Sequence, residues 1–366
     1  VVMTYKLYSE RIYVICKINK YYRKSKYYLI ERVNRMKKKI LMIGTGGTIA
    51  SKITSGGLDP QLTSDEILKY IPAISRICEV ETTQICNIDS TNIAPGHWIM
   101  MADTIRENYE KYDGFVICHG TDTMAYSAAA LSYMIQDSPK PIILTGAQKP
   151  INMEITDSKT NLYDSFLYAS YDGACGVQIV FNGKVILGTR ARKTHTKSFQ
   201  SFSSINYPYL AIVQDGNIIQ YIKQSKKDLP TFYNQLNAKV ALFKLIPGID
   251  SDILSYMLER NDAVIIESYG VGGIPTLPPY HFIDVIHHWT AKGKIIVMTT
   301  QVPNEGSDMK IYRVGHELKS RVSILEAYDM NTEAVVCKLM WILGRTKEPR
   351  EIKELFYTAI SNDILY

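Results

Sequence analysis

Residues 40–50 are Ile40-Leu41-Met42-Ile43-Gly44-Thr45-Gly46-Gly47-Thr48-Ile49-Ala50, an apolar run that leads directly into a glycine-rich turn. The same pattern recurs where the apolar run 115–118 leads into His119-Gly120-Thr121-Asp122-Thr123-Met124. Each run predicts a buried strand, and each turn places a threonine hydroxyl just beyond its end. Ligands of open α/β sheets bind outside the carboxyl ends of the strands, so both turns can meet one small molecule.

Apolar strand-like runs alternate with amphipathic helical stretches along most of the chain, which indicates an α/β fold. The predicted strands of the first block are 40–43, 80–85, 115–118, 142–145 and 177–181. Its predicted helices are 97–109, 124–135, 161–169 and one that opens with the capping box Thr63-x-x-Glu66. We therefore expect a larger N-terminal, mostly parallel sheet flanked by helices.

A second block predicts a smaller α/β domain. Its strands are expected at 241–245, 264–268 and 295–299, and its helices at 251–258, 280–290 and 332–343. Between the blocks the sequence becomes polar and lysine-rich, with Pro230, as in a connection. The predicted organisation is an N-terminal domain over 36–215, a linker over 216–240 and a C-terminal domain over 241–366.

The basic charge of the chain is concentrated at its start. The net charge is +6, yet residues 1–40 carry twelve Lys and Arg against two Glu, so the rest is mildly acidic. Composition therefore gives no case for nucleic-acid binding by the body of the protein. The start itself could be a nucleic-acid or membrane-surface arm.

We favour a different interpretation of residues 1–35. Met36, followed by three lysines and the first apolar run, is typical of the start of a cytosolic enzyme, so 1–35 is expected to be an extension outside the fold. The longest apolar stretch of this extension, around residues 12–16, is too short for a signal peptide. No later run is long enough for a bilayer, so we expect a cytoplasmic protein without a membrane partner.

The six cysteines are scattered without a close CxxC pair, which predicts reduced core thiols. The seven histidines show no metal-binding spacing. We therefore expect no metal and no cofactor. The first glycine-rich turn could also be a dinucleotide loop, but Ile49 stands where the last glycine of GxGxxG would be.

Together the two turns resemble the signature motifs of the L-asparaginase family. The resemblance runs from about Lys37 to the C-terminus. It includes, in family order, Asp89-Ser90, Thr145-Gly146-Ala147-Gln148, Lys193, Ser268-Tyr269-Gly270-Val271-Gly272 and Thr300-Gln301-Val302-Pro303. The last two are in the style of the cytosolic type I enzymes. The resemblance implies an enzyme that hydrolyses L-asparagine to L-aspartate and ammonia without metal or cofactor, as a homodimer or homotetramer.

The resemblance also implies the catalytic residues. Thr48 would be the nucleophile that forms an acyl-enzyme. A hydroxyl alone attacks an amide too weakly at neutral pH, so the site also needs groups that take and return its proton. Thr121, Asp122 and Lys193 would form the second cluster, in which the lysine and the carboxylate adjust the proton affinity of the threonine. Without the family, Asp122 could simply cap a helix, and Lys193 could lie in a solvated loop.

The substrate-binding residues that the resemblance implies are Gly47, Asp89, Ser90, Thr91, Thr121, Asp122 and Ala147. The Ser90 hydroxyl would hold the α-carboxylate of the substrate, Asp122 its α-ammonium, and the backbone at Ala147 would face the scissile amide. Read alone, Asp89-Ser90 is an ordinary turn and Ala147 a strand-end residue. Active sites of the family form between subunits, for which Ser268 and Glu305 are candidates.

The sequence departs from the family pattern at two places. A lid tyrosine is usual about ten residues beyond the nucleophile, whereas this chain has Leu58 within a glycine-containing loop that suits a mobile lid. Ser158 follows Asp157 where the family string is Ser-Asp-Gly, so Asp157 and Asn161 are expected to organise the active-site loop.

Two other functions are compatible with the motifs. The first is the asparaginase-like subunit of a glutamyl-tRNA amidotransferase, which carries a folded domain before its first motif. Residues 1–35 are too short and too poorly patterned for such a domain. The second is a non-catalytic module that binds a small molecule, which would leave Thr48, Thr121, Asp122 and Lys193 without use.

Overall fold

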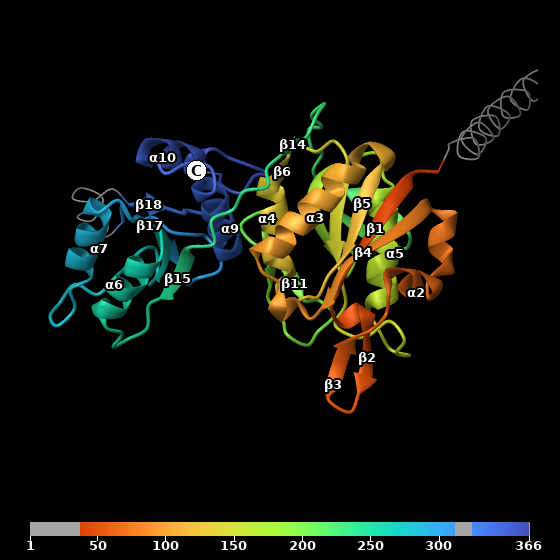
Figure 1. Cartoon of the computed structure of the whole chain (residues 1–366), viewed down its shortest axis with the longest axis horizontal. Helices are drawn as coiled ribbons and strands as arrows, with labels where there is room; N and C mark the ends of the chain where they lie inside the picture. Colours follow the sequence, from red (N-terminus) through yellow and green to blue (C-terminus); the bar gives the residue numbers. More distant parts are fainter. Residues whose placement is uncertain (1–36, 312–323, 366) are drawn as a thin grey trace, which may run out of the picture. The chain divides into compact units, whose positions relative to one another are not determined.

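The structure is a computed structural model that describes residues 37–311 and 324–365 (Figure 1). The expectation that residues 1–35 form no part of the fold lies outside these described residues. The described chain contains a larger, mostly parallel sheet and a smaller parallel sheet, each with flanking helices. The predicted α/β fold class is therefore confirmed.

The larger sheet has eight strands in the order β13-β12-β9-β8-β7-β5-β1-β4. They are β1 (Lys39–Gly46), β4 (Glu79–Ile88), β5 (Gly114–Cys118), β7 (Pro141–Thr145), β8 (Gly176–Phe181), β9 (Lys184–Leu187), β12 (Ala211–Gln214) and β13 (Asn217–Gln220). The pairs from β4 to β8 are parallel, and those from β8 to β13 are antiparallel. Every residue of the central strands β5 and β7 is buried, because helices cover both faces.

Four α-helices flank this sheet: α2 (Ser64–Lys69), α3 (Pro95–Asn108), α4 (Met124–Met134) and α5 (Ser158–Ala169). Apolar residues of α3 and α4 pack with Leu41 and Ile43 of β1, whereas those of α2 and α5 pack with Ile40 and Met42. Alternate residues of β1 thus supply two cores, one on each face. The capping box at Thr63 is present, with hydrogen bonds in both directions to Glu66.

Several short elements were not predicted, since two to five residues carry too little periodicity to be recognised. They include β9, β12 and β13 of the larger sheet and the strands β2 (Ser51–Thr54), β3 (Gly57–Pro60), β6 (Ile135–Gln136), β10 (Ala191–Lys193), β11 (Phe202–Ser204) and β14 (Thr231–Phe232). The 3₁₀ turns η1 (Thr48–Ala50), η2 (Pro72–Arg76), η3 (Ser90–Asn92) and η4 (Tyr109–Lys111) were not predicted either. The stretch 216–240, expected as a linker, contains β13 at the sheet edge and β14, which pairs with β6. The domain boundaries themselves stay a prediction.

The smaller sheet has the order β15-β16-β17-β18, with every pair parallel. Its strands are β15 (Val240–Lys244), β16 (Ala263–Ser268), β17 (Ile295–Thr300) and β18 (Leu325–Glu326), and its helices are α6 (Ser251–Arg260), α7 (Phe282–Ala291), α9 (Thr332–Leu343) and α10 (Pro349–Tyr357). The predicted strands and helices of this block are present within a few residues, whereas α10 and β18 were not predicted.

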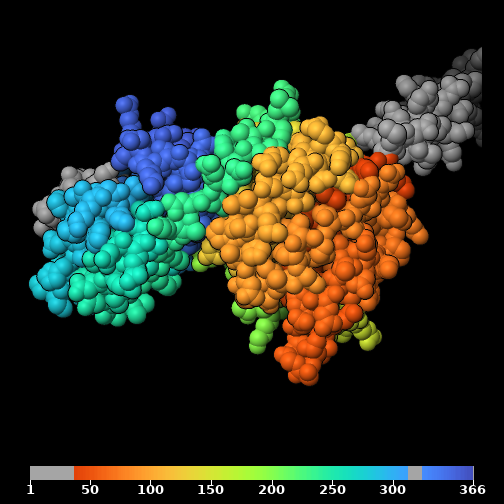
Figure 2. Space-filling model, in the orientation of Figure 1, coloured from red at the N-terminus to blue at the C-terminus, as the bar shows by residue number. Residues whose placement is uncertain are grey.

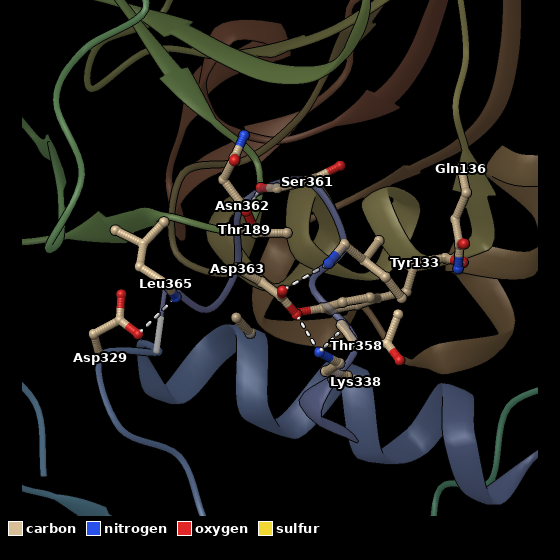
Figure 3. A network of polar contacts seen from close by, with 12 residues as sticks. Tyr133, Gln136, Thr189, Asp329, Lys338, Thr358, Ser361, Asn362, Asp363 and Leu365 are labelled. Atoms are coloured by element: carbon tan, nitrogen blue, oxygen red, sulfur yellow. Dashed lines mark hydrogen bonds and ion pairs between the residues drawn. The ribbon is translucent and has the colours of Figure 1, made fainter. Parts of the chain in front are cut away.

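Helix α9 packs against both parts of the fold. We call the larger sheet with its helices the first layer, and the smaller sheet with its helices the C-terminal layer. Of its 12 residues, 11 are buried, and its apolar side chains share one core cluster with α3, α4 and the larger sheet. Its buried Lys338 makes a 2.7 Å ion pair with Asp363, whose carboxylate also accepts a 2.9 Å hydrogen bond from Tyr133 of α4 (Figure 3). The C-terminal tail is thus tied to both layers.

None of the helices within the described residues combines the length and the apolar character needed to cross a membrane.

One carboxyl group in the first layer is buried without compensation. Asp164 of α5 is 6% exposed, and no hydrogen bond or ion pair reaches its carboxylate from the residues that the structure describes. Burial raises the pKa of this carboxyl to about 7. The folded state therefore retains a proton that the unfolded chain releases near pH 4, so this group lowers stability as pH rises from 4 to 7.

We predict that Asp164→Asn raises the free energy of unfolding by roughly 2 to 4 kcal/mol at pH 8, because the amide carries no charge to desolvate. The gain should vanish toward pH 3, below the ordinary pKa of an Asp carboxyl, where the wild-type carboxyl is protonated in both states. Urea unfolding at both pH values measures this, with the exposed Asp228→Asn as control. A gain that does not depend on pH would contradict the assignment.

Candidate functional site

The first signature turn begins where β1 ends. Gly46 and Gly47 have φ of 101° and 77°, in the left-handed region that glycine adopts without strain. Thr48 follows in the 3₁₀ turn η1 and is half-buried. No residue of the described ranges makes a hydrogen bond to its hydroxyl.

The second turn lies directly against the first. A Cβ atom added to Gly47 would lie 2.3 Å from the Cα of Gly120, and one added to Gly120 would lie 2.6 Å from Oγ of Ser90. Such distances exclude any side chain at either position. The two threonine turns and the Asp89-Ser90 turn are therefore packed together at the carboxyl ends of β1, β5 and β4, where the sequence analysis expected a ligand.

Lys193 joins this cluster from a distant part of the sequence. Its Nζ donates a 2.8 Å hydrogen bond to Oγ1 of Thr121 and makes a 2.6 Å ion pair with Oδ1 of Asp122. Thr121 is 4% exposed, and the Lys193 side chain is 16% exposed, whereas that of Asp122 is 56% exposed. A shielded ammonium therefore connects a buried hydroxyl to a carboxylate that is open to a ligand.

The turn at Asp89 combines a capping role with a contact to the second motif. The Asp89 carboxylate accepts a 2.8 Å hydrogen bond from the backbone N–H of Thr91 and so caps η3. Oγ of the buried Ser90 accepts from the N–H of Asp122 at 3.2 Å, and the Ser90 carbonyl accepts from Thr123. Since Ser90 accepts here, its own O–H stays available to donate to a ligand.

Ala147 lies in a turn that Asp157 and Asn161 shape. The Asp157 carboxylate accepts hydrogen bonds from the N–H groups of Gln148 and Lys149, and Asn161 donates to the Gly146 carbonyl. Burial raises the pKa of Asp157, although these hydrogen bonds oppose the shift. Both residues therefore organise the loop after β7, as the sequence analysis expected of them.

His119 holds the second turn, a role that the sequence analysis missed. Trp98 donates to Oγ of Ser127, Ser127 then donates to Nε2 of His119, and Nδ1 of His119 donates to the Gly120 carbonyl. Full burial lowers the pKa of His119 to about 4. The ring is therefore neutral near pH 7, which fits its use as a structural hydrogen-bond relay. Its position directly before Gly120 was the available signal.

The loop after Thr48 forms a hairpin rather than an irregular lid. Strands β2 and β3 pair antiparallel, with Leu58 opposite Ile53, and the hairpin stands out from the surface (Figure 2). Both side chains are largely exposed, at 51% and 72%. The two-residue turn at Ser55-Gly56 was a hairpin signal that the sequence analysis did not use.

Ser268 and Glu305 are not joined to this cluster. Ser268 is buried in β16 and donates to the Thr299 carbonyl, and the Glu305 N–H donates to Asn206. Neither makes a hydrogen bond or an ion pair with the Thr121–Lys193 cluster within the described residues. Their assignment to a site between subunits stays a prediction.

The chemistry of the site is that of hydroxyls, a lysine and a carboxylate. Across the described ranges, no group of three or more His, Cys, Asp or Glu is placed to hold a metal ion. The described cysteines, at positions 78, 86, 118, 175 and 337, are all free thiols. Such groups can donate and accept hydrogen bonds and exchange a proton.

Two family models match the chain over most of its length. "Asparaginase, N-terminal" matches residues 39–226, and "Glutaminase/Asparaginase C-terminal domain" matches residues 239–356. The L-asparaginase of Thermococcus kodakarensis is 37% identical over 329 residues, which are 89% of this chain and 99% of that protein. A solved structure of the thermostable L-asparaginase from the same organism is 36% identical and superposes with a TM-score of 0.83, over 90% of this chain and 99% of the other.

Two further similar proteins are another asparaginase and a subunit of a different enzyme. The L-asparaginase I of Vibrio cholerae has a TM-score of 0.81 at 28% identity and covers 90% of this chain and all of that one. A glutamyl-tRNA(Gln) amidotransferase subunit from Pyrococcus horikoshii is 33% identical over 340 residues, which are 89% of this chain and 76% of that protein. With both family models matched in order, this chain is a member of the asparaginase family.

Proposed function

We propose that this protein hydrolyses L-asparagine to L-aspartate and ammonia through an acyl-enzyme on Thr48, without metal or cofactor. The observation that carries the proposal is Lys193 Nζ, which reaches both Thr121 and Asp122 where the two signature turns pack together. This is a nucleophile turn beside a proton-handling cluster, the arrangement that an amidohydrolase requires.

The mechanism has two displacements. Oγ1 of Thr48 forms a bond to the side-chain carbonyl carbon of asparagine while its proton passes to the cluster. The C–N bond then breaks, and the leaving nitrogen takes a proton to depart as ammonia. Water attacks the ester carbon in the second step, its proton passes back to Thr48, and aspartate is released.

The residues of the cluster divide the work. Since Lys193 donates to Thr121, it stabilises the deprotonated form of that hydroxyl, which can then accept or pass on a proton. Lys193 engages only Oδ1 of Asp122, so Oδ2 of this exposed carboxylate is available to the α-ammonium of the substrate. Gly47, Asp89, Ser90, Thr91 and the backbone at Ala147 complete the binding site, with the Ser90 hydroxyl on the α-carboxylate.

We also propose that the protein is a homodimer or homotetramer and that it is located in the cytoplasm. The free cysteines suit the reducing conditions of that compartment. A structure titled "Probable Cytoplasmic L-asparaginase from Campylobacter jejuni" has a TM-score of 0.75 with this chain at 27% identity. The similarity to the amidotransferase component supports the second candidate function, in which ammonia is released for a partner enzyme.

A steady-state ammonia assay on the purified chain separates these functions. We expect release of ammonia and aspartate from asparagine without any partner protein or tRNA, because the whole cluster lies within one chain. Glutamine serves as the comparison substrate. Release only when a partner and tRNA are added would favour the amidotransferase function, and release under neither condition would favour a binding module.

The two threonines are separated by trapping the covalent intermediate. With a reactive asparagine analogue, we expect mass spectrometry of the quenched wild type to show an adduct on Thr48 and none after Thr48→Ala. Thr121→Val should slow turnover yet still form the adduct, because Thr121 handles protons. An adduct on Thr121 in the wild type would reverse the roles of the two residues.

Lys193→Met should lower kcat by about 100-fold or more, with a much smaller change in KM, because it removes a proton-handling group and leaves the substrate contacts. Lys197→Met, an exposed lysine on the same segment, is the matched control and should retain both constants. A raised KM with normal kcat would instead make Lys193 a binding residue.

A further inference from the structure

The three residues before Lys193 each contact the C-terminal layer. Arg190 is fully buried and pairs with Asp329 at 2.7 Å. The carbonyl of Ala191 accepts a 3.0 Å hydrogen bond from Asn331. Arg192 lies 3.7 Å from the carboxylate of Glu333. Lys193, the next residue, instead contacts Thr121 and Asp122 of the first layer.

Arg190 is the strongest of these anchors, since its guanidinium uses all three nitrogens. Nη1 donates to the Asp329 carbonyl at 2.8 Å, Nη2 to the Asp329 carboxylate at 2.7 Å, and Nε to the Asn362 carbonyl at 2.6 Å. The other oxygen of the Asp329 carboxylate accepts from the N–H of Leu365 (Figure 3). The fork of Arg190 thus fixes strand β10 to the tail at residues 361–365.

The same tail also fixes the residues that Lys193 contacts. Helix α4 begins two residues after Asp122, and its Tyr133 donates to the Asp363 carboxylate at 2.9 Å. Lys338 of α9 completes this buried group with a 2.7 Å ion pair to Asp363 (Figure 3). Asn362 therefore anchors the strand of Lys193, while its neighbour Asp363 anchors the helix that follows Asp122.

We propose that Arg190, seated on Asp329 and the C-terminal tail, is a positioning residue that sets where Lys193 Nζ lies relative to Thr121. This inference rests on the proposed role of Lys193 in proton transfer. A long lysine side chain that is partly solvent-exposed has many rotamers, so a fixed backbone three residues upstream restricts where its ammonium can go. Proton transfer depends on that position, because a misplacement of about 1 Å can cost 100-fold in rate.

The test is a double-mutant cycle of Arg190→Met with Lys193→Met in the full chain. Alone, Arg190→Met should lower kcat for asparagine by about 100-fold, with a much smaller change in KM, since no substrate contact is lost. In the Lys193→Met background, Arg190→Met should lower kcat no further, because the group that it positions is absent.

Two more variants separate positioning from stability. Arg190→Lys retains the cation beside Asp329 but not the three-nitrogen fork, so its kcat should fall between those of the wild type and Arg190→Met. If Arg190→Met does not fold, Arg190→Lys takes its place in the cycle. Leu258→Ala, a fully buried residue in the core of the smaller sheet, is the control for lost stability and should retain kcat per folded molecule.

Two outcomes would overturn the positioning role while the proposed function stands. In the first, the loss of kcat in the double variant equals the product of the losses in Arg190→Met and Lys193→Met. In the second, Arg190→Met and Leu258→Ala lose kcat equally. A Lys193→Met variant with normal kcat would overturn the proposed catalytic role of Lys193, and the positioning role with it.

Discussion

The site depends on one backbone contact, the approach of Gly47 to Gly120. No side chain fits between these two residues, because a Cβ on Gly47 would fall 2.3 Å from Cα of Gly120. Close-packed interiors do not yield to such an overlap, so substitution of either glycine would push the two turns apart. Thr48 and Thr121 follow these glycines directly, and Ser90 packs against the second. The positions of Thr48 and Thr121 thus depend on a contact between the backbones of two glycines.

Buried charge organises the rest of the molecule. Arg190 with Asp329 and Lys338 with Asp363 are ion pairs almost without solvent exposure, where desolvation opposes the Coulombic attraction. Burial accordingly lowers the pKa of Lys338, and Asp363 offsets part of that shift. Such pairs add little net stability against an apolar core, whereas removal of one partner leaves the other charge buried and unpaired at a cost of about 3 to 5 kcal/mol. Both pairs hold the C-terminal tail. Arg190 and Asp329 contact Asn362 and Leu365, and Lys338 contacts Asp363.

Most of the regular structure could be predicted from the sequence, because its elements are long and strongly patterned. Helix 332–343 was predicted with both ends correct, and the strands around 115–118 and 142–145 are continuous apolar runs that only a doubly covered sheet can bury. The hairpin β2–β3 and strand β13 were missed as strands. Each has strands of four residues in polar sequence, where pairing with a neighbour rather than periodicity decides the structure.

The sequence alone determined the two strand-to-turn motifs, the α/β class and the family, because local patterns and residue order carry that information. It also named Lys193, but only through resemblance, since a lysine after Arg190-Ala191-Arg192 has no local feature that marks it. Tertiary structure decided that Lys193 reaches Thr121 across 72 positions of sequence and that Arg190, three residues earlier, is buried instead of solvated. Such contacts form between segments distant in the chain, and only the packing of the two layers brings them together.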